Sequence, residues 1–347
     1  MNRFIRANRF AAAVVLCAFG LLVGCASDRQ VIAQADQVHG TIKPAVMEDP
    51  VLAGYLQDVG NRIIESAKEM NLQGSGRDKS SEDNSWMFGE KMRFHFVNSK
   101  ALNAFTTGGE HMYIYTALFE QCKTEDELAA VMAHEFAHIY GRHVHKGMNR
   151  QYTALAVAAA AGGAGYAVAG KDSKTEGAAL GAGLGFAAAQ FANMGFTRKD
   201  EAEADDLGFQ FYTRAGWNPD HFGDFFQSMI DAGYDKTPAM MSDHPTLKSR
   251  VDAAKKRAAA LPPQADQWRR DPVAGTKRFK DLQARAARLG KTLPSDQTLA
   301  NSQELLQALP RSCVAPVEPK DAVQARERIV KRAEAAEKAQ QQQQQTR

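Results

Sequence analysis

The segment His134-Glu135-Phe136-Ala137-His138 holds the residue types and spacing of this chain that are best suited to chemistry. Histidines four positions apart lie one turn apart on the same face of an α-helix, so both imidazoles can bind one metal ion. A glutamate directly after the first histidine lies close enough to take a proton from a water molecule at that metal. The segment therefore predicts a zinc site, with His134 and His138 as ligands and Glu135 as general base. The alternative is a core helix whose histidines only make hydrogen bonds.

The residues before this segment predict the helix that must carry it. Thr124-Glu125-Asp126-Glu127 reads as a capping box, with Thr124 as the N-cap and Glu127 as the third helical residue. The acidic first turn suits the positive end of the helix dipole. Apolar residues then recur at helical spacing, as a buried helix requires, at Leu128, Val131, Met132, Phe136 and Ile139.

A second acidic motif, Glu201-Ala202-Glu203-Ala204-Asp205, is the candidate source of the third metal ligand. Glu201 and Asp205 are four residues apart and share a helix face, whereas Glu203 points about 160° away from Asp205. This spacing suits a carboxylate ligand at Glu201 and a second carboxylate at Asp205 that accepts the outer N–H of a ligating histidine. The alternative is a solvated acidic helix face, which charge runs commonly form.

The two motifs together resemble those of the gluzincin metallopeptidases, a family that includes HtpX, the CAAX prenyl protease, the mitochondrial Oma-type protease, BepA and LoiP. In that family the first glutamate of E-x-x-x-D binds zinc, and the resemblance assigns this role to Glu201. The resemblance covers about residues 45–255 and implies one zinc ion per chain. It also implies a mainly α (α+β) fold, in which a small β-sheet lies beside the active-site helix.

Two further segments fit the same family. Residues 93–97 and 111–115 alternate as two strands of a small sheet would. Residues 103–109, followed by 112–115, look like the family's strand beside the active site, and a glycine pair there fits a turn or a close backbone approach. This strand is a candidate for binding an extended substrate by backbone pairing, and an ordinary hairpin is the alternative. The residues assigned to it are Gly108, Gly109, Met112 and Tyr113.

The segment Ser242-Asp243-His244-Pro245, together with Arg250, resembles the family's late S-x-H-P element. His244 is expected either to stabilise the oxyanion of the intermediate or to shield the metal, and a loop before a helix is the alternative. Arg250 is expected to support the metal ligands from outside. On a continuous helix His143 faces away from His134, and a structural role is expected for it. The same role is expected for the other histidines without visible partners, His39, His95, His111 and His221.

Residues 1–24 have the pattern of a signal peptide, with three arginines, no acidic residue and a short apolar stretch. Leu22-Val23-Gly24-Cys25 resembles a bacterial lipobox, so Cys25 is expected to become the first mature residue and to carry lipid. With Ala26 next, lipoproteins commonly reach the outer membrane, and we expect a protein anchored there that faces the periplasm. Ordinary cleavage near Ala26, with Cys25 incidental, is the alternative.

Removal of the predicted signal changes the net charge and the number of available cysteines. The chain has 43 basic and 40 acidic residues, and without residues 1–24 it would be neutral. This balance gives no basic excess for nucleic acid. Cys17 lies within the signal, which leaves Cys122 and Cys313 for a disulfide in an oxidising compartment.

Composition divides the mature chain into four parts. Residues 25–44 follow the lipid anchor, and residues 45–260 form the metallopeptidase domain. Within it, the Ala/Gly-rich insertion 154–195 is interpreted as a packed helical hairpin, with a membrane-dipping element or a lid as alternatives. Residues 261–338 form a helical extension, and the glutamine-rich residues 339–347 are expected to be disordered. No repeat of fixed period occurs, so a partner role carried by the repeats of BepA-like proteins does not transfer.

The sequence therefore favours a zinc-dependent endopeptidase, anchored by lipid, that cuts misfolded or misassembled envelope proteins. Its expected partners are these substrates, the membrane and the outer-membrane assembly machinery. The alternative is an assembly or chaperone-like factor whose protease site is mostly latent and self-inhibited. The intact His-Glu-x-x-His motif, with Glu135 present, favours the enzyme.

Overall fold

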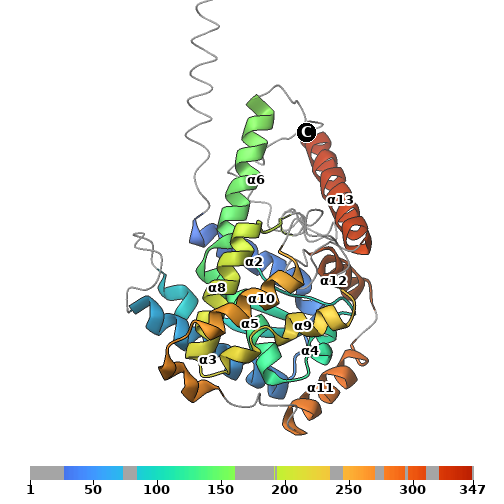
Figure 1. Ribbon diagram of the computed structural model, residues 1–347. Coiled ribbons are helices and arrows are strands. Elements are labelled where there is room, and N and C mark those ends of the chain that lie inside the picture. Colours follow the sequence, from blue (N-terminus) through green and yellow to red (C-terminus); the bar gives the residue numbers. More distant parts are fainter. Residues whose placement is uncertain are drawn as a thin grey trace, which may run out of the picture.

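The computed structural model describes residues 27–72, 84–160, 191, 194–234, 245–269, 277–293, 296–309 and 320–345. The signal peptide, Cys25, most of the Ala/Gly-rich insertion, His244 and Cys313 lie outside these ranges. The predicted fold class is confirmed, since the described residues form helices around one small sheet (Figure 1).

Most of the elements along the chain are helices, and three short strands lie between α3 and α4. They are α2 (Asp28–Ile42), α3 (Pro50–Leu72), β1 (Arg93–Val97), β2 (Ala104–Thr106), β3 (His111–Tyr115), α4 (Thr116–Gln121), α5 (Glu125–Tyr140), α6 (His143–Ala160), α8 (Arg198–Arg214), α9 (Asp224–Asp231), α10 (Leu247–Ala259), α11 (Lys277–Gly290), α12 (Gln297–Ala308) and α13 (Lys320–Gln345). Short 3₁₀ turns join several of them. None of the described helices is long and apolar enough to cross a bilayer.

Helix α5 carries the His-Glu-x-x-His motif through the core and begins where the sequence predicts. The Thr124 hydroxyl accepts a hydrogen bond from the Glu127 backbone N–H at 3.2 Å. The Glu127 carboxylate accepts a hydrogen bond from the Lys123 N–H at 2.6 Å, one residue before the Thr124 N–H that a capping box uses. Of the two hydrogen bonds of the predicted capping box, the one to the Thr124 hydroxyl therefore forms. Every residue of α5 from Asp126 to Ile139 is buried, so helical stability here comes mainly from packing.

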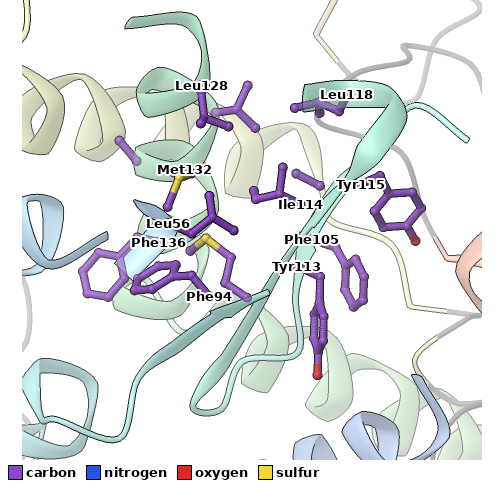
Figure 2. Close-up of a cluster of buried hydrophobic side chains, with 14 of the residues drawn as sticks. Leu56, Phe94, Phe105, Tyr113, Ile114, Tyr115, Leu118, Leu128, Met132 and Phe136 are labelled. Atoms are coloured by element: carbon purple, nitrogen blue, oxygen red, sulfur yellow. The ribbon is translucent and has the colours of Figure 1, made fainter. Parts of the chain in front are cut away.

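The three strands form a sheet in the order β1-β3-β2, with β1 parallel and β2 antiparallel to the central β3. Successive side chains of a strand point to opposite faces. Phe94 and Ile114 face the side on which Met132 and Phe136 of α5 lie, whereas Tyr113 lies on the opposite side (Figure 2). The sheet therefore separates the layer that carries the metal motif from a second layer.

The central position of β3 corrects the predicted substrate strand. Met112 and Tyr113 lie on β3, whose backbone pairs with β1 on one side and β2 on the other, and both side chains are fully buried. A strand paired on both sides cannot add an extended peptide. On the outer side of β1, Val46 forms a bridge with Val97. Within the described part of the chain, β2 is the edge strand that contacts α5, and no strand pairs with its outer side.

The glycine pair of the predicted strand allows two close approaches. Gly108 has a φ of 75°, and a side chain there would place Cβ 2.5 Å from Val144 of α6. A Cβ on Gly109 would lie 2.6 Å from Ala35 of α2. The pair holds the β2–β3 hairpin between α6 and α2, as the prediction of a turn or a close backbone approach requires.

The C-terminal extension packs on the domain that precedes it. Asn98 donates to the Gly290 carbonyl oxygen at 2.8 Å, and the Tyr115 hydroxyl donates to the Leu306 carbonyl oxygen at 2.7 Å. Phe279 of α11 and Leu305 of α12 are buried in the same apolar core as α5. The boundary predicted at residue 260 therefore does not separate two cores. The glutamine run also differs from the prediction, since it continues α13 to Gln345, and glutamine is a good helix former.

Helix α8 lies closely against α5 because residue 208 is a glycine. A Cβ on Gly208 would lie 3.0 Å from both the backbone N and the Cα of His134, which cannot move without displacing α5. The start of α8 is fixed by a complete capping box between Thr197 and Asp200. This packing sets the distance between the two motif-bearing helices.

We expect Gly208→Ala to destabilise the protein by about 1–3 kcal/mol, because the added methyl group forces α8 away from α5. Chemical denaturation measures this change. Gly54→Ala is the matched control, since Gly54 is also helical and a Cβ there meets nothing within 4 Å. The control should be neutral or stabilised by about 0.5–1 kcal/mol. Equal stability of the two variants would contradict the close packing of α8 on α5.

Candidate metal centre

Two histidines of α5 and one glutamate of α8 converge on a common point. The Nε2 atoms of His134 and His138 are 3.1 Å apart. One carboxylate oxygen of Glu201 lies 3.5 Å from Nε2 of His134, and the other lies 3.8 Å from Nε2 of His138. All three side chains are 0–1% exposed. The structure thus brings together the three residues that the two motifs nominate as ligands.

The state of Glu201 tests whether this group fits a metal ion. Neither of its carboxylate oxygens accepts a hydrogen bond within the described part of the chain, although the side chain is fully buried. A buried carboxylate without hydrogen bonds is costly unless a cation balances it. Two imidazoles and one carboxylate are also the ligand set of a catalytic zinc site that keeps a position open. The donors therefore fit a divalent metal, zinc in particular.

Asp205 and Arg250 hold the outer side of His134. The Nδ1 atom of His134 lies 2.9 Å from a carboxylate oxygen of Asp205. Arg250 of α10 donates to both oxygens of the same carboxylate, at 2.9 and 2.6 Å. An Nδ1–H donated to Asp205 leaves the Nε2 lone pair facing Glu201 and His138, which is the orientation that a ligand needs. The guanidinium of Arg250 is held in turn over the Phe226 ring, 3.9 Å from its centroid.

The charges of this group in the metal-free protein follow from its burial and from the contacts among its members. Burial and Arg250 act to lower the pKa of His134, but its interactions with Asp205 and Glu201 outweigh them and raise it to about 9. Burial holds the pKa of His138 well below its ordinary value. Burial acts to raise the pKa of Glu201, but the neighbouring His134, His138 and Arg250 bring it below its ordinary value. A metal that binds near neutral pH must therefore displace a proton from His134.

His143 lies beside the metal group, which corrects its predicted position. Helix α5 ends at Tyr140, and Arg142 has a φ of 53°, so the chain turns before α6 begins at His143. The turn resets the helical phase and places Nδ1 of His143 2.9 Å from Nδ1 of His138. The sequence signal for this turn is Gly141, because glycine commonly ends a helix. The prediction for His143 assumes a continuous helix and does not use this signal.

The predicted general base and the predicted disulfide involve residues outside the ligand group. Glu135 is fully buried and follows His134 on α5. Among the described residues Cys122 is a buried free thiol. Its predicted disulfide partner Cys313 and the predicted His244 lie outside the described residues. Phe196 was not predicted, and its ring stacks on His138 with 4.0 Å between centroids.

Comparison with known proteins gives one family. Residues 66–258, more than half of the chain, match the sequence model of peptidase family M48. The chain is 31% identical over 217 residues to the beta-barrel assembly-enhancing protease of Yersinia pestis. This alignment covers 62% of this chain and 40% of that protein. It is 27% identical over 172 residues to metalloprotease LoiP of Escherichia coli, covering 50% and 65%. It is 28% identical over 200 residues to the mitochondrial metalloendopeptidase OMA1 of Schizosaccharomyces pombe, covering 56% and 55%. The matched part thus spans less than half the length of the first of these relatives.

We expect Asp205→Asn to weaken zinc binding about 10–100-fold, the usual effect of removing the partner of a ligating histidine. Competition with a chromophoric chelator measures the affinity. The matched control is Asp206→Asn, because Asp206 is the next residue of α8 and its side chain is 57% exposed. Equal zinc affinity in the two variants would remove Asp205 from the site.

Proposed function

The chain belongs to peptidase family M48, and we propose that the whole protein is a zinc-dependent endopeptidase, one ion per chain, that cleaves misfolded or misassembled envelope proteins. The observation that carries the proposal is the meeting of His134, His138 and the buried Glu201 beside Glu135. The names of the relatives, a beta-barrel assembly-enhancing protease and two metalloproteases, support the choice of reaction, and the first name supports a role with envelope proteins.

The described residues provide the parts of a hydrolytic mechanism. Zinc, when bound, would polarise the scissile carbonyl group and make a water molecule more acidic. His134, His138 and Glu201 would hold the ion, and Asp205 keeps Nε2 of His134 turned toward it. The Glu135 carboxylate would take the proton of the attacking water and pass it to the leaving amine. Arg250 balances the charge of Asp205, and the Asp205 carboxylate therefore stays ionised and can accept the Nδ1–H of His134.

We further propose that Cys25 carries lipid and anchors the protein to the outer membrane, facing the periplasm. The support is the sequence Leu22-Val23-Gly24-Cys25 and its spacing from the fold. Helix α2 begins at Asp28, so two residues separate Cys25 from it, and at about 3.5 Å per residue the lipid would attach within about 11 Å of the helix. Asp28 itself binds Arg142 and His145 at the start of α6. A lipid on Cys25 would therefore hold the α5–α6 turn near the membrane.

The burial of the metal group favours a second candidate function. With His134, His138, Glu135 and Glu201 at most 1% exposed, a substrate carbonyl group reaches the centre only after part of the protein moves. A protein with a site of this kind can serve as an assembly factor whose protease activity is latent until a client opens it. In that case partners in the outer-membrane assembly machinery would be bound rather than cut.

We expect Glu135→Gln to keep the bound zinc and the fold but to lower cleavage of an unfolded test protein by about 10²–10⁴-fold, because the proton acceptor is lost. Glu65→Gln is the control, since Glu65 lies on α3 and its side chain is 64% exposed. Residual activity of Glu135→Gln within a few-fold of the wild-type protein sinks the assignment. If wild-type protein cleaves nothing, and both forms restore outer-membrane assembly equally in cells that lack the gene, the latent alternative holds.

We expect Cys25→Ser to accumulate as an uncleaved precursor or to lose its membrane attachment, because serine cannot take the thioether-linked lipid. Mass spectrometry of the mature N-terminus and membrane fractionation measure both outcomes. Cys17→Ser is the control, since Cys17 lies within the predicted signal. A wild-type N-terminus without lipid would show that the anchor is wrong.

A further inference from the structure

Three histidines that no part of the metallopeptidase mechanism uses meet on the far face of the sheet. His39 comes from α2, His95 from β1 and His111 from β3, and one ring nitrogen of each lies within 4.8 Å of the others. We propose that this cluster is a second, non-catalytic metal site that binds a transition-metal ion such as Zn²⁺. The proposal does not depend on the peptidase function.

The parallel register of β1 and β3 creates the cluster. His95 pairs with Tyr113, and Arg93 pairs with His111, so His95 and His111 lie diagonally on the same face of the sheet. Nε2 of His95 is 3.0 Å from Nδ1 of His111. Two nitrogens on one tetrahedral zinc ion, at about 2.0–2.1 Å each, are about 3.3 Å apart. A small outward shift of this pair therefore suffices to admit the ion.

Asp36 and Tyr113 act as outer partners of the cluster. Nε2 of His111 lies 3.5 Å from a carboxylate oxygen of Asp36, so an Nε2–H directed there leaves the Nδ1 lone pair facing His95. This is the carboxylate–histidine–metal arrangement of many zinc sites. Without a bound ion, Nδ1 of His39 lies 2.9 Å from the Tyr113 hydroxyl, which can act as donor or acceptor and so tolerates either tautomer of His39.

The three rings are uncharged near neutral pH, as metal ligands must be. Burial first, with neighbouring His111, His39 and Arg93, lowers the pKa of His95 to about 3. Burial and His39 lower the pKa of His111 to about 4, and burial with Lys43 lowers that of His39. Neutral imidazoles favour zinc, nickel or copper over calcium or magnesium, which take oxygen ligands. Because Lys43 and Arg93 oppose a cation and Asp36 alone favours it, we expect weaker binding here than at Glu201.

Closing this site requires one side chain to turn. The rings of His39 and His111 are stacked, with centroids 4.1 Å apart and planes only 3° apart. Imidazole lone pairs lie in the ring plane, so two parallel stacked rings cannot both point at one ion. A rotation of the His39 ring brings its nitrogen toward the His95–His111 pair, and the bound ion then ties α2 to the sheet. The ion would thus join α2, the helix that directly follows the proposed lipid anchor, to the rest of the domain.

The test is the zinc stoichiometry of the full chain purified in detergent, stripped with a chelator, titrated with Zn²⁺ and desalted before elemental analysis. We expect two equivalents in the wild-type protein and the loss of one in His95→Gln/His111→Gln. His221→Gln is the matched control and should keep two, because His221 pairs with Asp224 outside both clusters. One equivalent in the wild-type protein, or two in the double variant, would overturn the proposal.

A second variant guards against a double variant that fails to fold. His39→Gln alters only α2, and it should also lose the weaker equivalent while it keeps the stronger one. In the wild-type protein the second equivalent should raise the melting temperature, since the ion joins α2 to the sheet, and this rise should be absent in His39→Gln. A stoichiometry of two in a folded His39→Gln variant would show that these histidines do not form the site.

Discussion

The burial of the Glu201 carboxylate between two histidines is the constraint on which the rest of the catalytic layer depends. A charge removed from water costs several kcal/mol unless opposite charge or hydrogen bonds replace the water. In the metal-free protein the opposite charge comes from the protonated His134 and from Arg250 behind it. The arrangement exists only because Gly208 lets α8 approach the backbone of His134. Asp205 and Arg250 then fasten α10 to the same point, so three helices share one electrostatic centre.

Spacing along the sequence was enough to predict the parts of this centre that lie on single helices. The i, i+4 relation of His134 and His138, and that of Glu201 and Asp205, follow from helix geometry alone. Thr124 as N-cap is equally local and occurs as predicted. His143 was misplaced because the turn at Gly141 and Arg142 resets the helical phase, and one left-handed residue is enough to do this.

Contacts between distant segments were beyond reach of the sequence pattern. The alternation of residues 93–97 and 111–115 predicts strands but not their order, so the central place of β3 and the buried state of Tyr113 came only from the structure. The cluster of His39, His95 and His111 depends on that same order, which is why these histidines had no visible partners. The packing of α11 and α12 on the domain likewise rests on long-range hydrogen bonds such as that from Tyr115 to Leu306. The sheet thus turns an apolar face, with Phe94 and Ile114, toward α5, and it turns His95 and His111 toward α2.

The position of zinc in the protein tests the central claim most directly. Anomalous X-ray diffraction from zinc-loaded crystals of the full chain, recorded above and below the zinc absorption edge, locates each ion without assumptions about its ligands. The account predicts a peak about 2.0–2.2 Å from Nε2 of His134, Nε2 of His138 and a carboxylate oxygen of Glu201. A zinc peak at the two histidines with Glu201 turned away, or no peak there at all, would contradict it.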